Sequence, residues 1–292
     1  MLQPKTPNEY LAMQQSIRAA SKALLPMLDR EANPEEFQRV EFDAIASTVA
    51  LMATQGEDAN KKTTEQIHKF LRSRKQLLLP DISTGMQAAM LLELQPNKSP
   101  ARKTYELLLE LTEDDERPEI LGLRFQIEGS IRRLDLLGKP LELKATSLAG
   151  KSIDISDYNG KYVLVNFFIR DSRSCEAVIP QLRKYSEKYA DQLAVVAVAV
   201  DQDPKALAEY VKSSQFAWPV IHDNAANPSE RLHHKYGVSA FPLVLLLNKV
   251  GEVVSLEAHS SELDRIMQML FEAPTPAPVP KPSGAAATND KS

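Results

Sequence analysis

Three short apolar runs in the second half of the chain constrain its fold more than any other feature. They span residues 162–169, 194–200 and 243–247, and stretches of helical period lie between them. Runs this short and this rich in Val, Ile and Leu are typical of strands buried on both faces of a sheet. Strands that alternate with helices predict an α/β sheet covered by helices. We expect this domain to span residues 135–272.

The first 134 residues carry apolar side chains at helical spacing instead. Residues 6–9 and 33–36 each combine a capping residue, a proline at the first helical position and an acid at the third. Further helical stretches follow, and the last of them carries an apolar stripe from Ile120 to Leu134. Such stripes are typical of the buried faces of an all-α domain, either a helical bundle or a series of helical hairpins.

Composition limits the classes of partner. The chain has 35 basic and 39 acidic side chains, which argues against a nucleic-acid-binding protein. No apolar run approaches the roughly 18 residues of a membrane span. The first residues show no signal peptide. Residues 273–292 are mostly proline, alanine and small polar residues, and they predict a disordered tail.

Cys175 is the single cysteine of the chain. It excludes an internal disulfide and a cysteine-based zinc cluster. His233 and His234 are adjacent and should point apart on a helix. No glycine-rich phosphate-binding motif occurs, so we expect no metal and no cofactor. Cys175 follows the apolar run at 162–169 after a short loop, and Ser172 stands three residues earlier at the expected start of a helix. Residues 236–242, Tyr-Gly-Val-Ser-Ala-Phe-Pro, precede the last apolar run.

These segments, in this order and spacing, resemble the thioredoxin-like proteins of the TlpA/ResA (redoxin, AhpC/TSA-related) group. The resemblance covers residues 138–271 and implies a thioredoxin-like fold with a central mixed sheet flanked by helices. It implies that Ser172 stands at the nucleophilic cysteine, Cys175 at the resolving cysteine and Pro242 at the cis-proline. Disulfide exchange needs both an attacking and a resolving thiol, so we expect self-resolving dithiol exchange to be absent. The simplest role for Ser172 is a helix N-cap.

Three interpretations of Cys175 stay open: an inert buried thiol, a monothiol that forms mixed disulfides, and a peroxide-reactive thiol. Residues 172–175, Ser-Arg-Ser-Cys, also resemble the T-x-x-C motif of peroxiredoxins. However, Phe168 and Pro242 stand where peroxiredoxins carry a proline and an activating arginine. Asn166 and Val178 replace carboxylates that thioredoxins or many TlpA/ResA relatives carry, so no obvious proton acceptor remains.

Two functions therefore remain open. The first is monothiol oxidoreductase chemistry through Cys175, which an external thiol would have to complete. The second is a redox-inactive module that binds an extended peptide or partner protein at the groove beside Pro242. The side chains expected around this groove are Phe168, Arg170, Asp171, Arg173 and Phe241. The resemblance also implies an extracytoplasmic location, while the sequence indicates no oligomeric state.

Overall fold

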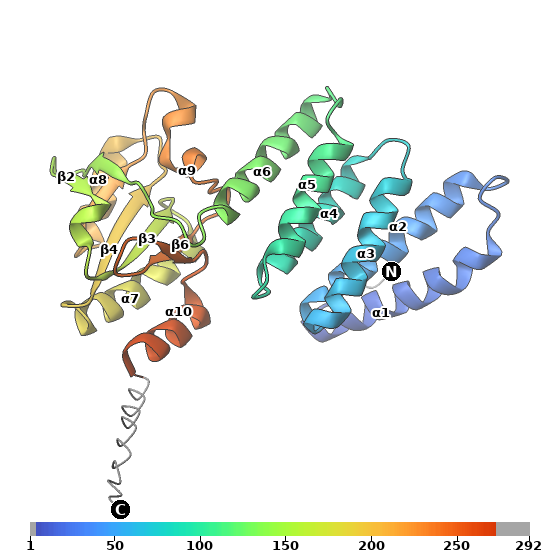
Figure 1. Cartoon of the computed structure of the whole chain (residues 1–292), viewed down its shortest axis with the longest axis horizontal. Helices are drawn as coiled ribbons and strands as arrows, with labels where there is room; N and C mark the ends of the chain where they lie inside the picture. Colours follow the sequence, from blue (N-terminus) through green and yellow to red (C-terminus); the bar gives the residue numbers. More distant parts are fainter. Residues whose placement is uncertain (1–3, 273–292) are drawn as a thin grey trace, which may run out of the picture.

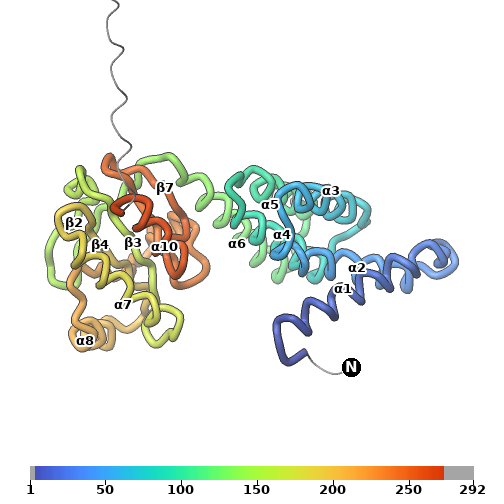
Figure 2. The backbone as a smooth tube through the Cα atoms, turned by 90° about the horizontal axis from the view of Figure 1, so that it is seen from below, coloured from blue at the N-terminus to red at the C-terminus, as the bar shows by residue number. Residues whose placement is uncertain are grey.

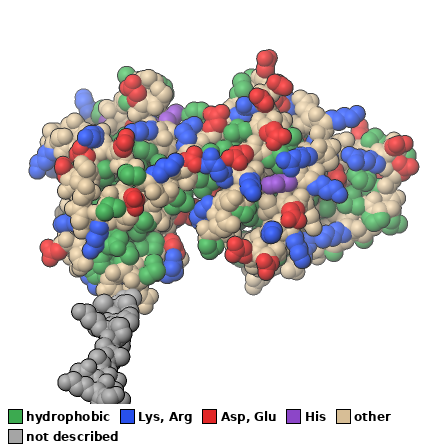
Figure 3. Space-filling model, in the orientation of Figure 1, with side chains coloured by type: hydrophobic (Ala, Val, Ile, Leu, Met, Phe, Trp, Pro, Cys, Tyr) green, Lys and Arg blue, Asp and Glu red, His purple; other side chains and the backbone are tan. Residues whose placement is uncertain are grey.

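The structure is a computed structural model that describes residues 4–272. The tail expected from residue 273 onward lies outside the described residues. A helical half stands beside an α/β half, and the predicted fold class is confirmed (Figure 1). Within residues 4–272, no helix is long and apolar enough to cross a membrane. Basic and acidic side chains are interspersed over the face that Figure 3 shows.

Helices adjacent in the chain pack side by side in the helical half. Their bounds are α1 (Pro7–Leu24), α2 (Pro34–Ala50), α3 (Glu57–Ser73), α4 (Leu79–Glu93), α5 (Ser99–Leu111) and α6 (Pro118–Leu134), with 3-10 turns η1 (Leu25–Met27) and η2 (Met52–Thr54). The hydroxyl of Thr6 accepts a hydrogen bond from the backbone N–H of Glu9 at 3.2 Å, which caps α1 as its sequence predicts. Contacts of α1 with α2, and of α5 with both α4 and α6, make the helices a row of hairpins.

The apolar stripe of α1 is not buried, contrary to the expectation from its period. Tyr10 is 40% exposed and Leu24 is 46% exposed. Among the other helices, α1 packs chiefly on α2, and both lie at the far end of the row (Figure 2). A helical period marks an apolar face but does not supply a partner for it, and here the row of helices ends before that face is covered.

The α/β half contains a five-stranded sheet in the order β5-β4-β3-β6-β7. The strands of this sheet are β3 (Tyr162–Phe168), β4 (Leu193–Ala199), β5 (Val220–His222), β6 (Leu243–Leu247) and β7 (Val253–Ser255). The helices of this half are α7 (Arg173–Lys188), α8 (Pro204–Ser213), α9 (Leu232–Lys235) and α10 (Ser260–Met267), with 3-10 turns η3 (Ile155–Tyr158) and η4 (Pro228–Glu230) and the π-helical segment η5 (Gln268–Glu272). Strands β1 (Lys144–Thr146) and β2 (Ser152–Asp154) form a separate antiparallel hairpin. The three apolar runs are β3, β4 and β6, as expected.

The central strand β3 separates two apolar clusters. Val163, Val165 and Phe167 belong to a cluster that continues through Ile127 of α6 into the helical half. Leu164 and Phe168 belong to the cluster on the opposite face, beneath α7, α8 and α10. Because successive side chains of a strand point to opposite faces, the sheet is covered on both sides. The helical half is therefore joined to the sheet by a continuous core and not by a linker.

Candidate functional site

The candidate site lies where β3 ends and α7 begins. β3 runs antiparallel to β6 with Phe167 opposite Leu243, so the loop that ends at Pro242 lies beside the end of β3 where α7 begins. The Phe241–Pro242 peptide bond is cis. We call residues 237–242 the cis-proline loop. The fold therefore brings the start of α7 and this loop together, although they are far apart in the sequence.

Ser172 is the N-cap of α7. Its backbone is extended, with φ −106° and ψ 116°, and its Oγ accepts a hydrogen bond from the backbone N–H of Cys175 at 3.5 Å. The hydroxyls of Ser172 and Ser174 lie 2.9 Å apart, and Ser174 Oγ donates to the carbonyl of Phe241 at 3.5 Å. The serine hydroxyls thus connect the helix start to the cis-proline loop.

Cys175 is a free thiol that lies in the core. Its side chain is 1% exposed and packs in the cluster beneath α7 with Val178 and Leu182. A thiolate must reach its substrate to attack it, and a residue this buried has no surface to offer. Burial in an apolar cluster is the common state of a free cysteine.

Asn166 lies on the α7 side of β3 by strand alternation, between Leu164 and Phe168. It is 1% exposed, and neither its Oδ1 nor its Nδ2 has a hydrogen-bond partner among the described residues. The sequence places Asn166 where thioredoxins carry a buried carboxylate. An amide cannot take up the proton that such a carboxylate would accept, so Asn166 cannot serve as a general base for Cys175.

The loop between β3 and α7 is held by Asp201, which follows β4. Its carboxylate accepts from the backbone N–H of Arg170 at 3.0 Å and lies 3.6 Å from the Arg170 guanidinium. Arg170 also pairs with Asp171, which has a left-handed backbone with φ 59°. Both acids therefore engage Arg170 and reduce the charge it can offer to a ligand. Arg173, in contrast, is exposed on the first turn of α7.

The structure places Phe168 in the core and not at the groove. Its side chain is 0% exposed and stacks on Phe216, with the ring centroids 5.5 Å apart. Phe241 is half-buried at the rim of the cis-proline loop. Of the two aromatic candidates, only Phe241 has a surface that a ligand can contact.

A histidine pair lies beside the cis-proline loop, although neighbouring side chains of a helix are expected to point apart. The ring centroids of His233 and His234 lie 4.2 Å apart. Asp223 holds this pair, because its buried carboxylate accepts from His233 Nδ1 at 2.5 Å and from the backbone N–H groups of Leu232 and His233. Burial alone would raise the pKa of Asp223, but these hydrogen bonds outweigh it and lower the pKa below its ordinary value.

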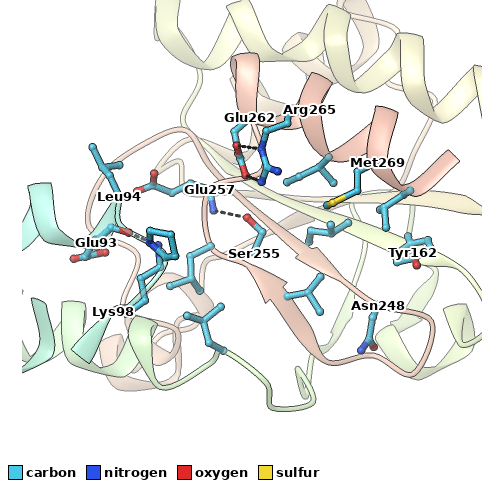
Figure 4. A pocket seen from close by; sticks show the side chains of 17 residues that line it. Glu93, Leu94, Lys98, Tyr162, Asn248, Ser255, Glu257, Glu262, Arg265 and Met269 are labelled. Carbon is cyan, nitrogen blue, oxygen red and sulfur yellow. Dashed lines mark hydrogen bonds and ion pairs between the residues drawn. The ribbon is translucent and has the colours of Figure 1, made fainter. Parts of the chain in front are cut away.

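A separate cavity of about 650 Å³ lies between the α4–α5 loop and the β7–α10 region (Figure 4). On one rim Glu262 pairs with Arg265 at 2.7 Å, and on another Lys98 donates to the backbone carbonyl of Glu93. Both cations are thus already partnered. None of the residues predicted for the site lines this cavity, and residues 4–272 contain no group of three metal-binding side chains.

Part of this chain is similar in sequence to known thioredoxin-like proteins. A protein-family model described as thioredoxin-like matches residues 159–253. The thiol-disulfide oxidoreductase ResA of Bacillus thuringiensis is 29% identical over 110 residues, which are 37% of this chain and 61% of that protein. The thioredoxin-like protein YneN of Bacillus subtilis is 24% identical over 127 residues, which are 42% of this chain and 72% of that protein.

Among solved structures, the thioredoxin domain of a thiol-disulfide oxidoreductase from Bacteroides vulgatus superposes with a TM-score of 0.42 at 21% identity, covering 46% of this chain and 96% of that one. The chain spans about three fifths of the length of the ResA relatives, 61% in the case above. The match of the family model, residues 159–253, lies in the α/β half, as the resemblance predicts.

Proposed function

We propose that this TlpA/ResA-like thioredoxin-fold protein binds an extended segment of a partner protein at the cis-proline loop, and that it does so without dithiol exchange. The proposal rests on the two residues that the resemblance aligns with the attacking and resolving cysteines, Ser172 and Cys175. Ser172 caps α7 at the attacking position, and Cys175, the single thiol, is 1% exposed. A serine hydroxyl is too weak a nucleophile without an activating base.

Support for binding comes from the backbone of the cis-proline loop. Ser239 and Ala240 are exposed, and within residues 4–272 their N–H and C=O groups have no backbone hydrogen-bond partner. Unpaired and exposed backbone groups of this kind can form hydrogen bonds with an extended peptide, as in recognition by strand addition. Loss of the attacking thiol leaves these groups intact.

The position of Cys175 in the first turn of α7 favours monothiol chemistry as a second candidate. Helix-terminal N–H groups favour a thiolate once the cap at Ser172 opens. The thiolate would attack a glutathione mixed disulfide, release the substrate thiol and become glutathionylated itself. A second glutathione thiolate would then release Cys175 as oxidised glutathione forms.

Alkylation of the native protein between pH 5 and pH 10 separates the two candidates. For a binding module, we expect Cys175 to react only after denaturant is added, and reduction of a glutathione mixed disulfide to be undetectable. The Cys175→Ala variant is the matched control for background reduction. Fast alkylation of the native protein together with Cys175-dependent turnover would show that the protein is redox-active and would establish the monothiol role.

A further inference from the structure

Helix α6 of the helical half packs directly on the cis-proline loop. A Cβ atom added to Gly237 would lie 1.8 Å from the carbonyl oxygen of Gly129 in α6, so the two backbones touch. Gly237 also has φ +66°, a conformation that glycine adopts without strain. Arg133 of α6 donates to the carbonyl of Gly237 at 3.2 Å. These contacts fix α6 beside the backbone edge that the proposed function uses.

A cavity of about 260 Å³ lies between α6 and the loop, and we call it the α6 pocket. Phe125 and Arg132 form its α6 wall, while Ser239 and Phe241 form its loop wall. Pockets for drug-sized ligands usually measure about 300–1,000 Å³, so this one suits a single large side chain better than a cofactor. The exposed backbone of Ser239 and the pocket are adjacent, because Ser239 contributes to both.

The walls of the α6 pocket are mostly apolar, and Arg132 contributes a positive charge. Phe125 is 50% exposed, and its ring lies 5.2 Å from the ring of His234 and 5.8 Å from the Arg132 guanidinium. Burial, followed by the positive charge of His233, lowers the pKa of His234 and so favours its neutral form.

Among residues 4–272, Arg132 forms one ion pair, with Glu128 at 3.9 Å, and both side chains are exposed. An exposed pair of this kind contributes little, so Arg132 remains free to meet an acid on a ligand.

We propose that the α6 pocket is the specificity pocket for the peptide bound at the cis-proline loop, with a large apolar side chain entering beside Phe125 and Phe241 and a neighbouring acidic side chain pairing with Arg132. The inference rests on the proposed function, because the peptide must first add to the backbone of Ser239 and Ala240. In this arrangement, a helix of the helical half selects the peptide that binds to the α/β half.

The test is a selection of random peptides, displayed on phage, against the full chain. We expect the enriched peptides to share a large apolar residue next to an aspartate or glutamate. For one synthetic peptide of this pattern, we expect Phe125→Ala to weaken binding by about tenfold or more, since the pocket loses a wall that buries an apolar side chain. Arg132→Gln should remove the preference for the acid.

Leu121→Ala is the matched control, because Leu121 is also 50% exposed and lies on α6 one turn before Phe125, outside the pocket. It should bind as the wild type does. Peptides that bind the wild type and Phe125→Ala equally would overturn the α6 pocket but leave the proposed function standing. Failure of every peptide to bind the wild-type chain would overturn both.

Discussion

Replacing Arg133 with methionine removes one half of a buried ion pair at the junction of the two halves. The guanidinium donates to Glu93 Oε2 at 2.6 Å and to the carbonyl of Gly237 at 3.2 Å. The Arg133 side chain is 11% exposed and that of Glu93 is 5% exposed. Tyr105 donates its hydroxyl to the other carboxylate oxygen of Glu93 at 2.7 Å. In the variant, Glu93 keeps this one bond but has lost its counter-charge.

The expected loss of unfolding free energy in Arg133→Met can be calculated in two ways, and both give a similar value. Removal of one partner from a buried ion pair costs about 3–5 kcal/mol, because the remaining charge stays buried. Alternatively, the variant's Glu93 takes up a proton. An ordinary glutamic acid is half protonated near pH 4.3, so neutralising it at pH 7 costs about 3.7 kcal/mol. We therefore expect Arg133→Met to lower the free energy of unfolding by about 3–4 kcal/mol at pH 7.

If Glu93 is neutral in the folded variant, the stability loss in Arg133→Met must depend on pH. A carboxyl group that must be neutral in the folded state is easier to neutralise as the pH falls. The penalty in Arg133→Met should therefore shrink by about 1.4 kcal/mol for each pH unit between pH 7 and pH 5. The double variant Arg133→Met with Glu93→Gln carries no buried charge, so its stability should not vary with pH in this way.

Urea unfolding can be followed with one probe for each half. Trp218 is the single tryptophan, is buried in the α/β half and reports on that half by fluorescence. Far-UV circular dichroism reports mainly on the helices. Since the pair joins the two halves, both signals should shift to lower urea in Arg133→Met. The control is Arg132→Met, the adjacent and exposed arginine, which should change stability by less than about 0.5 kcal/mol. A loss below about 1 kcal/mol, or one that is equal at pH 5 and pH 7, would refute the reasoning.

Three further predictions concern other parts of the chain. Ser172→Cys should form a disulfide with Cys175 in oxidised glutathione, seen as the loss of both alkylatable thiols in the denatured protein; two thiols that persist would contradict the proposed alignment of the site. Burial, followed by the hydrogen bond to Asp264, raises the pKa of Tyr185 to about 12 from 10.0, so its stabilisation is present below pH 10 and lost as the pH rises through 12. Tyr185→Phe should therefore flatten the fall of the urea midpoint between pH 9 and pH 11, and an unchanged slope would exclude this cause. Asp223→Asn should cost about 1–3 kcal/mol, measured by urea unfolding, because a buried donor at the start of α9 loses its acceptor, and a neutral result would contradict that assignment.

The apolar runs and helical periods predicted most of the elements, because both are local patterns. The segment that forms β5 was missed, since it has only three residues and follows a Trp-Pro pair. Local patterns carry no information on which surface covers which. For this reason the exposure of the α1 stripe and the contact of Gly129 with Gly237 were not predicted.

The features of the candidate site likewise fall into those that local sequence predicts and those that packing determines. The capping role of Ser172 follows from its own residue type and from the helix that begins after it. The burial of Cys175 and the location of Phe168 in the core depend on packing beneath α7, which the sequence left open. The support of His233 by Asp223 and the α6 pocket depend on contacts between separate segments of the chain. A pattern search has no signal for them, apart from the glycines that permit the close approach.

Energetics explain why a binding module on this fold needs the helical half. Ser239 and Ala240 present only a short backbone edge, and each hydrogen bond to it adds about 0.5–1.5 kcal/mol net. These few hydrogen bonds together fall short of the binding free energy of roughly 8 kcal/mol that a micromolar complex needs, because ordering a peptide also costs free energy. A redox enzyme of this fold can hold its substrate through a mixed disulfide, but a chain without an accessible thiol must use non-covalent contacts alone. One large side chain in the α6 pocket would add about 1.5–3 kcal/mol, and a pair with Arg132 would add more. On the proposed function, α6 is thus part of the binding site, and Arg133 fixes its distance from the loop.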